Sequence, residues 1–188
     1  MKKSIFVLTI ALMGTLLGSS FMVQGQTATN GLSLGMPQIN LLSSASASIS
    51  LQLTTATAGE AVKSSMSDST ARVKISSIIA EGQTRILNAQ VTTGAIPGGT
   101  TLQLAAKTPN ANFGGTKGDF GSNATLSTAS ATSIVTGIGS CFSGTTLDDG
   151  YVLKYTWGLN NPATTYGLIR ASAGTAITVT LTLSAGGA

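Results

Sequence analysis

Apolar and polar residues alternate along most of this chain, and the alternation predicts β-strands, because successive side chains of a strand point to opposite faces of a sheet. In each run one parity is apolar and the other polar, as in an antiparallel sheet with one face on a core and one in solvent. The clearest runs are 49–53, 71–75, 87–91, 102–104, 151–159 and 177–183, with shorter candidates at 124–127, 133–136 and 167–171.

Clusters of Gly, Pro, Asn and Asp separate these runs and predict turns. The strands number about seven to nine, at a spacing of roughly 10–15 residues, which is typical of a β-sandwich. No long amphipathic helix is predicted. We therefore expect an all-β fold, an immunoglobulin-like antiparallel β-sandwich formed by residues 49–188.

The first 25 residues have the three parts of a secretory signal peptide. Lys2 and Lys3 are followed by the apolar run 5–17 and then by small residues up to Gly25. This run is shorter than the roughly 20 residues of a membrane-spanning helix. We expect cleavage after Gly25, no membrane span after cleavage, and an exported protein located in the periplasm, at the cell surface or outside the cell.

Composition excludes several classes of function. The chain has no histidine and only six acidic residues, and 9% of its residues are charged. It therefore cannot build a Ser-His-Asp triad or an imidazole metal site, and we expect neither an enzyme nor a cofactor. The net charge of +4 falls to +2 without the signal peptide, and the remaining basic residues are scattered. Nucleic-acid binding needs a concentrated basic face, so we do not expect it.

The segment 26–48 is the most suggestive for assembly. Leu32, Leu34 and Met36 alternate with polar or small residues, Pro37 interrupts the pattern, and apolar alternation then resumes. The segment is either an extension that pairs with a neighbouring subunit or the first strand of its own domain. An extension would be needed for assembly and not for folding. Deleting residues 26–44 would then abolish assembly and leave the core folded. The candidate assembly contacts are Leu32, Leu34, Ile39, Leu41, Ile177, Val179 and Leu181.

Aromatic residues suggest an alternative function, carbohydrate binding. Tyr151, Tyr155 and Trp157 share one parity with leucines, which favours a place in the core, although Trp157 remains a candidate glycan contact. Tyr166 lies outside this stripe, beside the turn at 160–162, and is the best candidate for an exposed ring that stacks on a sugar.

A single cysteine, an Asp pair and a long Gly- and Pro-rich segment are further candidates for chemistry. Cys141 is the only cysteine, so it is either a small buried hydrophobe or a thiol that pairs between chains. Asp148 and Asp149 predict a hairpin turn, with a weak calcium site involving Asp119 as the alternative. Residues 107–122, rich in Gly and Pro, predict a long surface loop without recognisable chemistry.

Three stretches together carry a resemblance. They are Ser50-Leu51-Gln52-Leu53-Thr54 followed by Ala58-Gly59-Glu60, then Gly137-Ile138-Gly139-Ser140-Cys141-Phe142-Ser143-Gly144, and Gly150-Tyr151-Val152-Leu153-Lys154-Tyr155 with the Thr-rich final strand. Their order resembles small exported bacterial β-sandwich proteins of uncharacterised function, and the resemblance implies architecture only.

The composition of the mature chain is similar to that of fimbrial subunits and coat-type proteins, since Thr, Ser, Gly and Ala make up 88 of its 163 residues. The chain departs from the usual pilins of the chaperone–usher type, which have a Cys pair. These observations predict a structural or adhesive cell-surface protein, a filament or coat subunit that assembles by edge-strand pairing. Its partners would be itself or other cell-surface proteins, or glycans in the alternative function.

Overall fold

The computed structural model describes residues 29–45, 48–54, 57–109, 112–146 and 148–187. The predicted signal peptide, 1–25, lies outside the described residues. The chain divides into two units after Gly35, and the described part of the first unit, residues 29–35, contains no helix or strand. The second unit, Met36–Ala188, contains all the strands described below. None of the helices within the described ranges has the length and hydropathy needed to cross a membrane.

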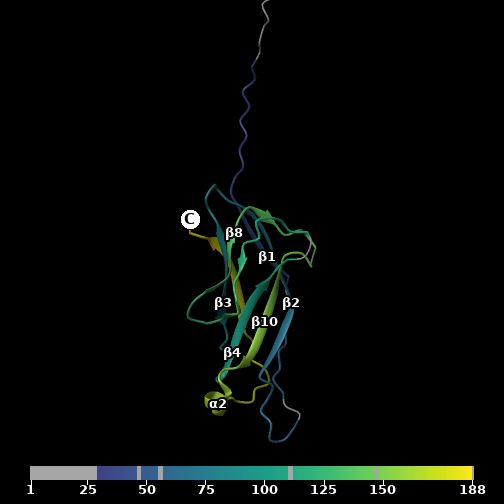
Figure 1. Ribbon diagram of the computed structural model, residues 1–188, viewed down its shortest axis with the longest axis vertical. Coiled ribbons are helices and arrows are strands. Elements are labelled where there is room, and N and C mark those ends of the chain that lie inside the picture. The colour runs from purple at the N-terminus through teal and green to yellow at the C-terminus, as the bar shows by residue number, and fades with distance from the viewer. Residues whose placement is uncertain (1–28, 46–47, 55–56, 110–111, 147, 188) are drawn as a thin grey trace, which may run out of the picture. The chain divides into compact units, whose positions relative to one another are not determined.

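Two antiparallel sheets pack together, which confirms the predicted all-β sandwich (Figure 1). The larger sheet consists of β1 (Ile39–Ala45), β2 (Ser65–Ile78), β4 (Thr100–Lys107), β5 (Gly114–Gly115), β7 (Ala124–Thr125), β9 (Cys141–Phe142) and β10 (Tyr151–Leu159). The smaller sheet consists of β3 (Arg85–Thr93), β6 (Asp119–Phe120), β8 (Thr132–Ile138) and β11 (Thr178–Ala185).

The strand order keeps the sandwich architecture but exchanges two strands. The larger sheet runs β5-β9-β2-β10-β4-β7, with β1 also on β2, and the smaller runs β11-β3-β8-β6. If the seven longer strands are lettered A to G along the chain, A, B, D and F share one sheet and C, E and G the other. Immunoglobulin constant domains instead place A, B, D and E together and C, F and G together. The fifth and sixth long strands have thus changed sheets.

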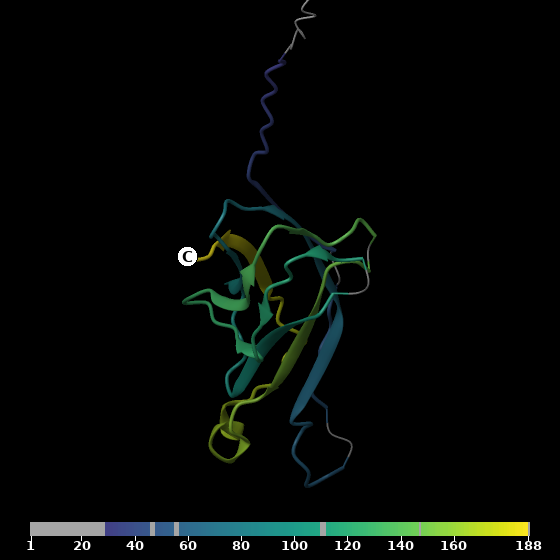
Figure 2. The same cartoon turned by 45° about the horizontal axis from the view of Figure 1, so that its top comes forward.

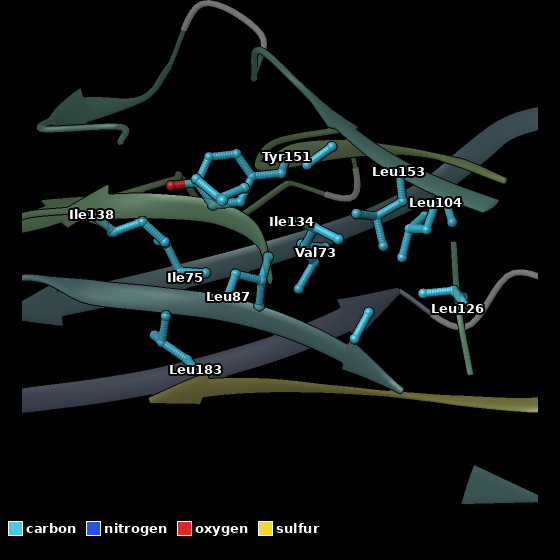
Figure 3. Close-up of a cluster of buried hydrophobic side chains, with 14 of the residues drawn as sticks. Val73, Ile75, Leu87, Leu104, Leu126, Ile134, Ile138, Tyr151, Leu153 and Leu183 are labelled. Carbon is cyan, nitrogen blue, oxygen red and sulfur yellow. The ribbon is translucent and has the colours of Figure 1, made fainter. Parts of the chain in front are cut away.

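The core lies between the two sheets and is formed by one parity of each long strand. Figure 3 shows side chains of β2, β3, β8 and β10 that meet there, with Leu183 of β11 at the rim. Tyr151 is the largest of the fully buried side chains. The predicted stripe of Tyr151, Tyr155 and Trp157 follows this pattern, since all three rings belong to the core or pack against it.

The predicted loop 107–122 is anchored by Tyr151. The rings of Phe113 and Phe120 lie 5.4 and 5.6 Å from the Tyr151 ring, centroid to centroid. The Tyr151 hydroxyl donates a hydrogen bond of 2.7 Å to the Lys117 carbonyl. Two very short strands, β5 and β6, interrupt the segment. Its two isolated aromatic residues therefore extend the core instead of lying on a free loop.

Two predicted strands are wrong. Residues 48–54 form no strand, although their side chains alternate between half-buried and exposed and Ile49 packs on the core. Alternation reports which side chains face the core, and it does not require a neighbouring strand to pair with. Residues 167–171 also form no strand, because the 3₁₀ turn η1 (Tyr166–Leu168), which follows the helix α2 (Pro162–Thr165), includes 167 and 168, and residues 169–171 pair with no strand. Figure 2 shows this helical segment at the end of the sandwich opposite the C-terminus.

The segment 26–48, predicted as either an extension or a first strand, contains two different stretches in its described part. Residues 39–45 form β1, which pairs with residues 72–78 of β2 in the protein's own sheet. Residues 29–38 form no strand. The interpretation as a first strand thus holds for β1, and a deletion of residues 26–44 would remove most of a core strand. A deletion meant to spare the sandwich has to end before Ile39.

Candidate functional site

The outer edge of β11 is the end of the four-stranded sheet. The Asn40 side-chain amide donates to the Leu183 carbonyl at 3.1 Å, and Asn40 belongs to β1 of the other sheet. On the side of β11 that faces β3, the N–H of Gly186, just after β11, donates to the carbonyl of Thr84, just before β3, at 2.8 Å. Successive residues of a strand direct their backbone groups to alternate sides. Val179 and Leu181 therefore direct their N–H and C=O groups away from β3, as Leu183 does.

The side chains along this edge are apolar and only half covered. Ile177, Val179 and Leu181 are half-buried and pack against the core cluster, whereas Leu183 is buried. These are the residues of the final strand that the sequence predicts as assembly contacts. The other parity, Thr178, Thr180 and Thr182, is exposed, and the Thr180 hydroxyl is 2.8 Å from that of Thr92 on β3.

The N-terminal segment exposes its apolar side chains to solvent. Leu32, Leu34 and Met36 are 81%, 85% and 78% exposed. Most large apolar side chains of a folded protein lose more of their surface than this on folding. The segment thus presents three apolar side chains of one parity, at two-residue intervals.

The beginning of β1 is tied to both sheets. The Arg85 guanidinium donates to the Ile39 carbonyl at 3.2 Å and to the Ser77 hydroxyl at 3.3 Å. Asn40 then reaches β11 through its bond to Leu183. Ile39, a predicted assembly contact, is thus half-buried inside the protein's own sandwich.

Replacing Asn40 with alanine is expected to lower the free energy of unfolding by about 1 kcal/mol, because the variant loses the hydrogen bond to Leu183. Urea denaturation measures this change as a lower midpoint with an unaltered slope. Gln38→Ala is the matched control, because Gln38 is exposed and precedes β1. Equal midpoints for the two variants would show that the bond does not join the sheets.

A shallow groove lies on the outer face of the larger sheet. Ser76 of β2 pairs with Leu41 of β1 on one side and with Phe142 of β9 on the other, so the three side chains share this face. Leu41 is 63% exposed and Phe142 is 59% exposed. The groove has a volume of about 390 Å³ and is lined by Leu41, Leu42, Ser43, Lys74, Ile75, Ser76, Gly144 and Thr145.

Sequence reasoning found Leu41 but missed Phe142. The strand β9 has only two residues, so no run of alternating residues reveals its parity. The available signal is its neighbour, since a buried Cys141 places the next side chain on the opposite face.

The aromatic residues predicted to contact glycans have different surroundings. Tyr166 is 40% exposed, and its hydroxyl accepts a hydrogen bond of 3.2 Å from the Val62 N–H. Trp157 is half-buried against the core, and its indole N–H donates to the Thr100 hydroxyl at 2.9 Å. The indole is therefore held in place within the sheet, and Tyr166 is the more accessible ring.

Cys141 is a small buried residue in β9. Its side chain faces the core, and burial raises the pKa of the thiol to about 11. The thiol is therefore protonated near neutral pH, and the protonated form is a poor nucleophile. Its burial matches the interpretation as a hydrophobe, while a bridge between chains would require the strand to open.

Asp149 organises the turn before β10, as the hairpin interpretation predicts. Its carboxylate accepts hydrogen bonds from the Thr146 N–H at 2.7 Å and from the Asn112 amide at 3.2 Å. These bonds, the one from the Thr146 backbone first, hold the pKa of this carboxyl below its usual value. Gly150 follows with φ of 99°, where a side chain would collide with the Val73 carbonyl. Within the described ranges no three Cys, Asp or Glu side chains gather as metal ligands.

The lowered pKa of Asp149 predicts an acid-sensitive stability. The carboxylate form is favoured in the folded state, so its contribution is complete above the unfolded pKa of about 3.9 and is lost as the pH falls through the lower folded value. Asp149→Asn is expected to be less stable than the wild type at pH 7 and to lose less stability between about pH 5 and pH 2. Urea midpoints across this range measure the difference. Parallel curves for the two proteins would contradict the assignment.

Searches of protein-family models, curated proteins and solved structures gave no match to this chain.

Proposed function

We propose that the protein is an exported structural subunit that assembles with copies of itself at the cell surface by pairing strand edges. The observation that carries the proposal is the exposure of Leu32, Leu34 and Met36 in an alternating segment. Fully burying one such side chain stabilises a complex by about 1.5–3 kcal/mol. Three of them on one parity provide a strong driving force for docking on a sheet.

The composition of β11 supports edge pairing. Exposed edge strands commonly carry lysine, proline or inward-pointing charges, which prevent pairing with other chains. The strand Thr178–Ala185 contains no charged residue and no proline. The segment 29–38 is also uncharged, so no electrostatic repulsion opposes its approach to such an edge.

The predicted signal peptide supports the exported location, because assembly outside the cytoplasm needs translocation of the chain first. The abundance of Thr and Ser on the solvent-facing parity of the strands supports a surface or extracellular role, since these residues keep a sheet soluble with few charges.

Cell fractionation combined with electron microscopy tests the proposal. Cells that express the full chain are expected to hold it in the surface or extracellular fraction, shortened by about 25 residues, in particles larger than one subunit. A full-length monomer in the cytoplasm would overturn the proposal. An exported protein that forms no larger particle would retain the location and overturn the structural role.

Carbohydrate binding is the second proposal, and the exposed ring of Tyr166 favours it. Aromatic rings bind sugars by stacking on their apolar faces. A glycan that binds the wild type is expected to bind Tyr166→Ala at least about tenfold more weakly, a loss of about 1.4 kcal/mol. Tyr155→Phe is the control, since its ring packs against the core. Unchanged binding by Tyr166→Ala, or the absence of binding to any glycan on an array, would argue against this function.

A further inference from the structure

Among the described residues, the part of the β11 edge that no other strand or side chain pairs with is short and well defined. Asn40 occupies the Leu183 carbonyl, so the open stretch ends there. Before it, Val179 and Leu181 direct both backbone groups to the outer side, and together with Ile177 they form the apolar parity of residues 177–181. An added strand of about five residues would satisfy these groups.

The N-terminal segment matches this stretch in length and pattern. Its alternating part, residues 32–36, has five residues and places Leu32, Leu34 and Met36 on one parity. Gly31 precedes it, and Pro37 ends it with a residue that cannot donate to a strand ladder. The half-buried Val179 and Leu181 would gain cover from these apolar side chains.

We propose that residues 32–36 of one copy add a strand beside residues 177–181 of a second copy, with Leu34 opposite Val179, extending the smaller sheet from four strands to five. The inference rests on the proposed function and names the contact through which it operates. The donor and acceptor are different surfaces, so the contact is heterologous. Repeated contacts of this kind form an open chain unless the rotation closes a ring.

The edge of β1 is the competing acceptor, and it is the poorer one. On its inward parity β1 offers Leu42 between Asn40 and Ser44, and Asn40 is already bonded to Leu183. On its outward parity the large exposed apolar residue is Leu41, which borders the groove on the outer face. The edge of β11 offers more apolar side chains that already face the core.

Disulfide trapping between two differently tagged copies tests the proposed contact. Both copies carry Cys141→Ala, so each has a single new thiol. One copy has Leu34→Cys and the other has Val179→Cys, and the mixture is treated with a mild oxidant. Opposed residues of adjacent strands place their Cβ atoms about 4.5–5.5 Å apart, near the distance that a disulfide spans. We expect a cross-linked heterodimer on a non-reducing gel.

Thr180→Cys is the matched control for the acceptor copy, because it follows Val179 in β11 and its side chain points to the opposite face. It is expected to give at least about tenfold less heterodimer with Leu34→Cys than Val179→Cys does. Leu42→Cys on β1 reports the competing acceptor. If Val179→Cys fails to fold, as judged by circular dichroism, Leu181→Cys combined with Leu32→Cys or Met36→Cys in the donor copy provides a second pair of positions.

Sedimentation of the same mixture without oxidant measures assembly separately from the β11 contact. Assembly with equal or higher cross-linking to Thr180→Cys or Leu42→Cys would overturn the β11 contact and leave the structural role standing. A mixture that remains monomeric would overturn both. Assembly with preferential cross-linking to Val179→Cys supports both.

Discussion

Replacing Leu32, Leu34 and Met36 together with serine is expected to weaken self-association of the exported chain by at least about 100-fold. Each side chain is at least 78% exposed, so the substitutions remove little that holds the subunit folded. Complete burial of the three side chains in a complex would contribute about 4.5–9 kcal/mol, and a loss of about 2.7 kcal/mol already corresponds to a factor of 100. Sedimentation velocity of the variant and the wild type over a concentration series measures the shift.

The control for this variant changes the same segment at its polar positions. Thr29→Ser, Ser33→Ala and Gln38→Ser leave the apolar parity intact, and together they are expected to associate like the wild type. The melting temperatures of all three proteins should agree within about 2 °C, because the sandwich begins after this segment. Association of the serine variant at wild-type strength would show that the exposed apolar side chains are not the contact.

Replacing Tyr151 with alanine is expected to lower the free energy of unfolding by about 3–5 kcal/mol, as for other large aromatic residues of a core. The ring is fully buried and contacts Phe113 and Phe120, which connect the segment after β4 to the core. For a domain of this size the loss corresponds to a fall of roughly 6–20 °C in melting temperature. The fluorescence of Trp157, the only tryptophan, follows the transition.

Tyr151→Phe separates the hydroxyl from the ring. This variant keeps the aromatic contacts and loses only the hydrogen bond to the Lys117 carbonyl, so it should lose about 0.5–1.5 kcal/mol. In the alanine variant the segment around Lys117 also loses its anchor and should be cut faster by trypsin. A melting temperature of Tyr151→Ala within about 2 °C of the wild type would contradict the role of the ring in the core.

The sequence predicts the longer strands well because alternation over seven or more residues determines which parity faces the core. The strands β2, β3, β10 and β11 follow this pattern, and so does the buried stripe that begins with Tyr151. The same reasoning failed at 49–53, where the side chains alternate but no neighbouring strand pairs with the backbone. It also failed at 167–171, where Pro162 begins a short helical segment.

The candidate site was predictable in its residue types and not in its geometry. The pattern singles out Leu32, Leu34 and the final strand, because apolar alternation at the ends of a sandwich indicates strands that lie near an edge. Which sheet contains β11, and which of its backbone groups are free, depends on contacts between residues far apart in the chain. The bond from Asn40 to Leu183 spans 143 residues, and no local pattern reveals it.

Sedimentation velocity of the chain from residue 26 onward, from about 1 μM to about 100 μM, tests most directly whether the protein is an assembling subunit. We expect species larger than the monomer that increase with concentration and disappear when Leu32, Leu34 and Met36 are replaced with serine. A single monomeric species at every concentration would contradict it.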